Sequence, residues 1–305
     1  MGNSVNVKEI KSFLEKEGLP FSIHGDLEKT VTGFSSLPRY QEGTITWNNS
    51  KKKLSEFPPH VSVCVVQEGT CMESETQIIS PNSKAVFFSI LEHFWGDEQD
   101  DDIPVIGSGT MISHNVQLGE NVRIGCNCSL IGDISIGGGT VIGDNVVIRN
   151  RVHIGRDCTI QSLTVIGEDG YGYSEDESHV KTMIRHFGGV TIGDNVFIGN
   201  HTNIARGTID DTIIGSGTKI APSTHIGHNN YIGENVSIVC AKLFGSVVVG
   251  NNAYISSCIV RNQIKIGSNA IVGMGSVVTK DVADNKVVMG APAKVIRENS
   301  GKEKL

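Results

Sequence analysis

A repeat with a period of six residues dominates the middle of the sequence. Stepping by six through this region meets an aliphatic side chain at eleven positions in succession: Ile106, Ile112, Leu118, Ile124, Leu130, Ile136, Ile142, Ile148, Ile154, Ile160 and Ile166. At the chain's hydrophobic content of 38%, chance would produce such a run with a probability on the order of 10⁻⁵. A period of six fits neither the 3.6-residue turn of an α-helix nor the two-residue alternation of a strand.

Small residues occupy fixed places in this repeat. Glycine directly follows seven of the eleven aliphatic residues, and the fourth residue after each is small or β-branched almost throughout. This pattern indicates a coil with three flat faces of six residues each, in which aliphatic side chains fill the interior and glycine eases the corners. The repeat resumes at Ile192, slips near Asp210, and continues through Ile238, Phe244 and, after further slips, Val278. The sequence therefore predicts roughly eight or nine turns of a parallel β-helix.

Composition excludes several other classes of protein. The net charge of −7 argues against a nucleic-acid partner, which requires clustered Lys and Arg. No run of 18 apolar residues is present, so no membrane-spanning segment is expected. The N-terminus has no secretory signal pattern, and the seven cysteines form no CxxC pair, so we expect reduced thiols and a cytoplasmic location. Cys128 and Cys158 fall on interior positions of the repeat and are interpreted as core residues.

The hexapeptides resemble those of the hexapeptide-repeat acyltransferases over roughly residues 104–296. This resemblance implies a mainly β fold with a left-handed parallel β-helix, and it also implies a homotrimer. The left hand comes from the resemblance alone, because parallel crossovers are normally right-handed. We expect three regions: an α/β nucleotide-sugar-binding domain at 1–100, the β-helix at 104–281, and a C-terminal cap and tail at 282–305.

The N-terminal region has the pattern of a small α/β domain. Residues 6–18 and 80–95 predict helices, residues 61–67 predict a strand, and the acidic segment 96–102 predicts a linker. A domain of this kind followed by a hexapeptide coil resembles the UDP-3-O-acylglucosamine N-acyltransferase family. That resemblance implies a uridine-binding role for the segment 44–57, with Asn49 as its asparagine and Trp47 stacking on the base. Uracil and thymine both remain possible, and Trp47 is equally compatible with a core position.

Residues 168–189 interrupt the repeat and predict a loop on one face of the coil, often the binding face. The DGYGY element in this insertion resembles the DGFGY loop of the same family. Tyr171 and Tyr173 are therefore candidates to cover a sugar ring, while Lys181, Arg185 and His186 are candidates to contact a diphosphate. The alternative is an insertion that only packs against a neighbouring subunit.

Histidine is the natural general base near neutral pH, and the sequence contains a group of three: His201, His225 and His228. The segment I-G-H-N followed by an I-G repeat is similar to the catalytic segment of the superfamily, which implies that His228 is the base. A surface histidine is the alternative. The stretch TNIARGTIDDTIIG (202–215), which includes Arg206, also resembles the UDP-3-O-acylglucosamine enzymes. We take His201, Arg206 and His225 as substrate-binding candidates, and the spacing of the histidines does not support a metal site.

This sequence departs from that family at three positions. Alanine occupies positions 205 and 221, where acidic residues are expected, and the second histidine of the family falls near Gln263.

The C-terminal segment 273–298 resembles the closing coil of acetyl-CoA-dependent sugar acetyltransferases. The resemblance implies that Gly273 and Gly275 allow close approach of the donor and that Lys294 and Arg297 contact its phosphates. Alternatively, this segment simply caps an open β edge. The backbone N–H of Gly245, in the coil after His228, is the candidate oxyanion donor.

These observations predict an N-acyltransferase acting on a UDP- or dTDP-linked amino sugar. Acyl-CoA is favoured over acyl carrier protein as co-substrate, and no permanently bound cofactor is expected. One alternative is a UDP-3-O-(3-hydroxyacyl)glucosamine N-acyltransferase of lipid A synthesis that uses acyl carrier protein. The other is a non-catalytic hexapeptide scaffold.

Overall fold

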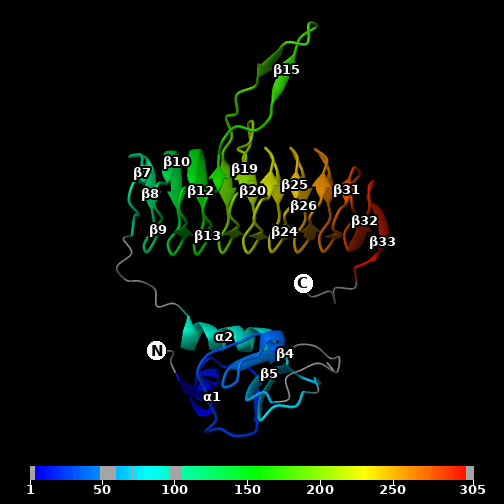
Figure 1. The fold of residues 1–305 in the computed structure, drawn as a ribbon. Helices are drawn as coiled ribbons and strands as arrows, with labels where there is room; N and C mark the ends of the chain where they lie inside the picture. The colour runs from blue at the N-terminus through cyan, green and yellow to red at the C-terminus, as the bar shows by residue number, and fades with distance from the viewer. Residues whose placement is uncertain (1–3, 49–59, 71, 97–104, 300–305) are drawn as a thin grey trace. The chain divides into compact units, whose positions relative to one another are not determined.

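The computed structural model describes residues 4–48, 60–70, 72–96 and 105–299. The chain divides into two compact units, Met1–Asp101 and Asp102–Leu305 (Figure 1). The structure confirms the expected fold class, a mainly β chain whose second unit is a left-handed parallel β-helix. Most of the expected linker at 96–102 lies outside the described residues. No helix in the described ranges is long and apolar enough to span a bilayer.

The N-terminal unit packs two helices with a four-stranded sheet of order β2–β6–β5–β4. Its sheet strands are β2 (Ser22–His24), β4 (Ile45–Asn48), β5 (Val63–Gln67) and β6 (Thr76–Ser80). Its other elements are β1 (Val5–Asn6), α1 (Val7–Lys16), β3 (Thr30–Val31), the 3-10 turn η1 (Leu37–Arg39) and α2 (Ser83–Trp95). Helix α1 begins with a capping box, in which Asn6 and Glu9 each accept a hydrogen bond of 2.8 Å from the other's backbone N–H. Both helices expected from the sequence are therefore present.

The second unit is a coil with three faces, and each turn passes from the first face to the second and then the third. The first face contains β7 (Met111–Ile112), β14 (Val165–Ile166), β19 (Asn203–Ile204), β22 (His225–Ile226), β25 (Lys242–Leu243), β28 (Ile259–Val260) and β31 (Val277–Val278). The second face contains β8 (Val116–Leu118), β17 (Val190–Ile192), β20 (Thr212–Ile214), β23 (Tyr231–Ile232), β26 (Val248–Val249) and β29 (Lys265–Ile266). Strands β10 (Ser129–Ile136) and β12 (Val147–Ile154) run continuously across both faces.

Each turn of the coil ends on the third face. It contains β9 (Arg123–Ile124), β11 (Val141–Ile142), β13 (Thr159–Ile160), β18 (Phe197–Ile198), β21 (Lys219–Ile220), β24 (Ser237–Val239), β27 (Tyr254–Ser256), β30 (Ile271–Val272), β32 (Lys286–Met289) and β33 (Lys294–Glu298). Strands within a face are parallel, except that β33 returns antiparallel to β32. The C-terminal segment therefore forms the last strand at one edge of this face.

The interior of the coil is the expected stack of aliphatic side chains. Leu130, Ile148 and Ile166 pair in register in successive turns, and all three are fully buried. Cys128 and Cys158 are also buried, as their repeat positions predict. Two aliphatic residues of the first turn, Ile106 and Leu118, are instead 42% and 37% exposed. Within the described chain, the first turn has a neighbouring turn on one side only, so its side chains are incompletely covered.

The prediction that Phe244 lies in the interior is wrong. Leu243 is the fully buried residue of that turn, while Phe244 is 45% exposed. The reason is a corner shortened by one residue, between β24 and β25. Ile226 pairs with Leu243, 17 residues later, whereas Ile220 pairs with Ile238 at 18. The slip therefore precedes Leu243, and a second shortening precedes Val260.

Turns are lengthened at a different corner, the one between the first and second faces, which we call the first corner. The chain makes a long excursion there between β14 and β17, and it adds four residues between β19 and β20. The excursion contains the hairpin β15 (Tyr173–Glu175) and β16 (Lys181–Met183), which projects from the coil (Figure 1). The insertion and the residues that follow it thus meet at one edge of the prism.

Candidate active site

A cavity of about 490 Å³ lies at the first corner, spread over several successive turns of the coil. It is lined by Gly170, Tyr171, Ala205, His225, Gly227, His228, Phe244, Gly245, Ser246, Asn262 and Gln263. These residues are distant in sequence and meet because equivalent corner positions of adjacent turns stack. Ser246 N–H donates to His228 O at 2.8 Å, and Gln263 N–H donates to Gly245 O at 3.0 Å.

The hydrogen bonds around His228 decide which of its ring nitrogens is free. His228 Nδ1 lies 2.9 Å from Asn229 Oδ1. That oxygen also accepts from the backbone N–H and the hydroxyl of Thr208, at 3.1 and 2.9 Å, while Asn229 Nδ2 donates to Asp210 O at 3.2 Å. Because Asn229 Oδ1 acts as the acceptor throughout, His228 carries its proton on Nδ1. Its Nε2 therefore has a free lone pair.

Because Gly245 has no side chain, it leaves room for the Nε2 atom of His228. A Cβ added to Gly245 would lie 2.6 Å from His228 Nε2, so any side chain there would collide with the imidazole. The backbone N–H of Gly245 has no acceptor within the described ranges, whereas the N–H of Gly227 one turn earlier donates to Leu243 O at 2.8 Å. The site thus combines a free imidazole nitrogen with an unused backbone donor.

Asn230 holds the two turns of this corner together. Its side chain is fully buried, and its Nδ2 donates to the carbonyl oxygens of Gly227 and Phe244 at 2.7 and 2.9 Å. These bonds join the turn that carries His228 to the turn that carries Gly245. The spacing between base and backbone donor is therefore set by the coil itself.

His225 lies on the first face beside this corner and contributes to the cavity wall. Burial lowers the pKa of His225, and the neighbouring charge of Lys242 lowers it further. A histidine whose pKa lies below its usual value of about 6.5 is neutral at pH 7. His225 therefore offers a neutral hydrogen-bonding ring to a ligand.

Arg206 contacts residues near both ends of the insertion. The side chain is largely buried, its Nε donates to Gly188 O at 2.6 Å, and its guanidinium lies 3.9 Å from Asp169 Oδ1. Burial lowers the pKa of Arg206, and Asp169 partly opposes this effect. Arg206, which the sequence predicted to bind substrate, therefore bonds to residues of the insertion and is not part of the cavity lining.

The other residues predicted on the insertion have different positions. Tyr171 is 77% exposed and lines the cavity, with its ring centre 4.9 Å from that of the exposed Tyr173. Lys181 pairs with Glu175 at 3.0 Å on the projecting hairpin. The assignment of His186 to a diphosphate is wrong, because its side chain is buried and packs edge to face against His228, with the ring centres 5.3 Å apart.

Several predicted residues lie at another corner, between the third and first faces. His201 is exposed there, away from His225 and His228. Gly273 and Gly275 occupy the same corner near the end of the coil, and Lys294 and Arg297 are exposed on β33. The structure of one chain does not bring these residues to the cavity at His228.

The predicted nucleotide residues fall in the N-terminal unit. Trp47 donates through its indole N–H to Ser83 Oγ at 2.9 Å and stacks on Phe87, with ring centres 6.1 Å apart. This packing favours the core interpretation of Trp47 over base stacking. Asn49 lies outside the described residues.

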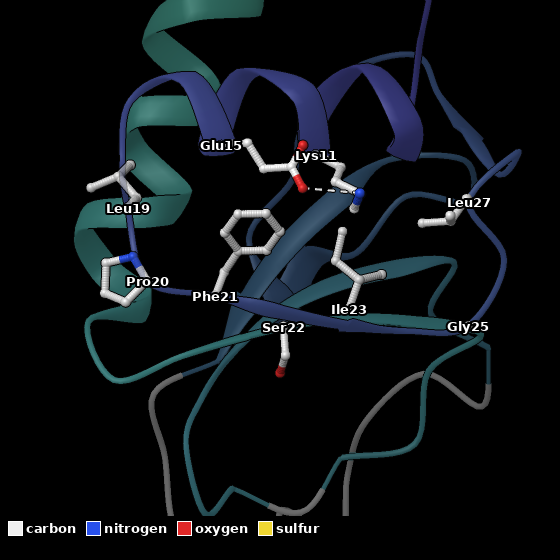
Figure 2. Close-up of a pocket in the computed structure, with 9 residues that line it drawn as sticks. All are labelled: Lys11, Glu15, Leu19, Pro20, Phe21, Ser22, Ile23, Gly25 and Leu27. Atoms are coloured by element: carbon white, nitrogen blue, oxygen red, sulfur yellow. Dashed lines mark ion pairs between the residues drawn. The ribbon is translucent and has the colours of Figure 1, made fainter.

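The N-terminal unit has a cavity of its own, of about 550 Å³, beside α1 (Figure 2). The side chains of Phe21 and Ile23 point toward α1, and Ser22 points away from it. The charges at its rim, Lys11 and Glu15, are paired with each other at 3.0 Å. Among the described residues, its lining includes no histidine, so this cavity does not offer the imidazole found at His228. In the described part of the chain, no three metal-ligating side chains converge on one point.

Sequence reasoning missed some of the residues that form the site. Asn229 directly follows His228 in the segment that resembles a catalytic one, so its place in that motif was the available signal. Phe244 and Asn262 had no signal, because their arrival at the cavity depends on the shortened corners.

Comparison with known proteins finds similarity to acyltransferases with hexapeptide repeats. Residues 133–168 match the family described as "Bacterial transferase hexapeptide (six repeats)", and residues 208–304 match the family described as "GMPPB C-terminal domain". A UDP-3-O-acylglucosamine N-acyltransferase from Coxiella burnetii is 36% identical over 88 residues, or 28% of this chain and 26% of the relative. The chain thus matches about a quarter of the length of the curated relatives.

Solved structures match a larger share of the chain. A UDP-N-acetylglucosamine acyltransferase from Arabidopsis is 27% identical, covers 65% of this chain and 71% of that one, and has a TM-score of 0.56. Its counterpart from Campylobacter jejuni, 23% identical with a TM-score of 0.57, covers 64% and 75% and is similar in fold. The resemblance to hexapeptide-repeat acyltransferases is therefore confirmed.

Proposed function

We propose that this protein is an acyltransferase that moves an acyl group from a thioester to the amino group of a UDP-linked glucosamine. The observation that carries this proposal is the free Nε2 of His228, which lies beside Gly245 at one cavity. The N–H of Gly245 has no acceptor among the described residues. Acyl transfer to an amine requires a base, an oxyanion donor and room for both substrates.

In the proposed reaction, the amine nitrogen attacks the thioester carbonyl carbon, and His228 Nε2 accepts a proton from that amine. The carbonyl oxygen becomes negatively charged and accepts a hydrogen bond from Gly245 N–H. Asn229 Oδ1 keeps its bond to Nδ1–H and stabilises the imidazolium. The C–S bond then breaks, and the sulfur leaves as a thiol after taking the proton from His228.

The proposed acceptor follows from the relatives. Those matched by sequence are named for acylating UDP-3-O-acylglucosamine, and the similar structures are named for acylating UDP-N-acetylglucosamine. These names favour UDP-3-O-acylglucosamine, the lipid A alternative, over an unspecified nucleotide amino sugar. We further expect a homotrimer in the cytoplasm and no resident cofactor.

Two classes of thioester are candidate donors. Sequence similarity at the C-terminus favours acyl-CoA, whereas the lipid A alternative uses acyl carrier protein. Purified protein should be supplied with UDP-3-O-acylglucosamine and either thioester, and product formation should be followed by mass spectrometry and thiol release. Turnover with one thioester identifies the donor class, and a dTDP-linked amino sugar tests the choice of base. Binding of the nucleotide sugar without turnover with either thioester would instead favour the scaffold alternative.

The proposal is tested most directly at His228. His228→Ala should lower kcat/KM by about 10²- to 10⁴-fold, because proton transfer by a positioned base contributes this much to the rate. His114→Ala is the matched control, since His114 is exposed in the first turn of the coil, and it should retain wild-type turnover. If His228→Ala kept most of its kcat/KM, the assignment of the base would be wrong.

A further inference from the structure

We propose that His186, in the insertion, is a positioning residue that holds the imidazole of His228 in its working orientation. The inference rests on the proposed role of His228 as the base. It assigns a specific task to an insertion residue that belongs neither to the catalytic motif nor to the cavity wall. Three observations carry it: the burial of His186, the contact between the two rings, and the way the loop is bonded to the coil.

His186 is held in a single orientation. Its side chain is 1% exposed, and Nδ1 lies 2.9 Å from the carbonyl oxygen of Ile184. Because a carbonyl oxygen can only accept, Nδ1 carries the proton and Nε2 carries the lone pair. That Nε2 is buried and has no partner among the described residues. A polar ring is seldom buried with one nitrogen unpaired, so packing must favour this placement.

The ring of His186 packs directly against that of His228. The ring centres are 5.3 Å apart and the planes are perpendicular, an arrangement favoured for ring pairs. Gly170 fits against both rings: a Cβ added there would lie 3.1 Å from His228 Cδ2 and 3.3 Å from His186 Nε2. Gly172 fits equally closely, with its added Cβ 3.0 Å from His186 Cε1. The two glycines of the DGYGY element therefore let its backbone lie close to the rings of His186 and His228.

Hydrogen bonds from two consecutive backbone N–H groups hold His186 in place, one to the start of the insertion and one to the coil. Its N–H donates to Asp169 Oδ2 at 3.4 Å, and Phe187 N–H donates to Thr208 O at 2.8 Å. Thr208 is also the residue that donates twice to Asn229 Oδ1. His228 is thus restrained by Asn229 through its Nδ1 and by His186 through the ring contact. Together they keep Nε2 of His228 directed toward Gly245.

The decisive comparison is between two substitutions of similar volume. His186→Phe keeps a flat ring against His228, whereas His186→Leu fills the space without one. We expect His186→Leu to lower kcat about tenfold with little change in KM, because misplacing a catalytic group costs rate rather than binding. His186→Phe should restore most of the lost kcat. His179→Ala, at the exposed tip of the hairpin in the same insertion, is the matched control and should have no effect.

A readout independent of turnover separates this proposal from the proposed function. In protein labelled with ¹⁵N-histidine, the signals of His228 are assigned by their loss in His228→Ala. We expect a fixed Nδ1–H tautomer in the wild type and in His186→Phe, and averaging of the two ring nitrogens in His186→Leu. Retention of both kcat and the His228 signals in His186→Leu would overturn the positioning role, as would a raised KM at unchanged kcat. Activity that survived His228→Ala would overturn the base assignment, while the ring signals would still report whether His186 orients His228.

Discussion

At the scale of single residues, the proposed chemistry depends on which nitrogen of His228 carries the proton. The sequence motif indicated His228 itself, because its neighbours match a known catalytic segment. The role of Asn229 required the structure, since it depends on Thr208 and Asp210, which lie about one turn earlier in the coil. A motif records residues adjacent in the chain, whereas this hydrogen-bond network joins residues of neighbouring turns.

Asn229 provides the first prediction. Asn229→Ala should lower kcat/KM by up to about a hundredfold, because His228 Nδ1–H loses its acceptor and the ring can rotate. Asn229→Asp should retain much more activity, since aspartate keeps an acceptor oxygen and tolerates the positive φ of 57° at this position. Steady-state kinetics of the two variants provide the test. Equal losses of kcat/KM in the two variants would show that activity does not depend on an acceptor oxygen at residue 229.

Gly245 provides the second prediction. Gly245→Ala should reduce kcat by at least about a hundredfold, because the new methyl group would lie where it displaces His228 Nε2. The loss should occur without unfolding, which circular dichroism would monitor. Gly33→Ala is a suitable control, because an added Cβ at Gly33 meets nothing within 4 Å. Normal turnover in Gly245→Ala would contradict the proposed position of the base.

At the scale of elements, changes in turn length are confined to corners. Strands on the faces must remain in register to keep their hydrogen bonds, so extra or missing residues are absorbed where the chain bends. The long insertion and the four added residues both enter at the first corner, beside His228. The sequence predicted the insertion and its limits of 168–189 from the broken period. It did not reveal that Asp211 and Arg206 bond to the base of the insertion, because those contacts join separate turns.

Asp211 provides a prediction at this scale. Burial alone would raise the pKa of Asp211, but hydrogen bonds from Gly189 N–H and the Thr191 hydroxyl, together with Arg151, outweigh burial and lower it. A carboxyl group with a lowered pKa stabilises the fold above its unfolded pKa of about 3.9, and this stability is lost as pH falls further. Asp211→Asn should therefore lower the free energy of unfolding by about 1–2 kcal/mol at pH 7.

The test is urea unfolding of wild type and Asp211→Asn at several pH values. The difference between the two proteins should be largest at neutral pH and should shrink as the pH falls below about 4. A difference that stayed constant across this range would show that the charge of Asp211 does not stabilise the insertion.

At the scale of the whole molecule, the coil is a stack in which each turn contacts only its neighbours. Ile148 is fully buried between Leu130 and Ile166, whereas Leu118 belongs to the incompletely covered first turn. Ile148→Ala should destabilise the protein by about 2–5 kcal/mol through lost burial and a cavity. Leu118→Ala should cost less than about 1 kcal/mol. Denaturant midpoints of the full chain measure both, and equal losses would contradict the difference in packing.

The sequence by itself determined the coil. Every six residues an aliphatic side chain must enter the interior, and this requirement is local, so it can be counted along the chain without knowledge of any contact. The motif around His228 and the limits of the insertion were equally local. Only the tertiary structure decided which residues share the first corner: it replaced Phe244 by Leu243 in the core, separated His201 from His228, and buried His186 against His228. These outcomes depend on how successive turns stack, and one residue gained or lost at a corner changes which side chains meet.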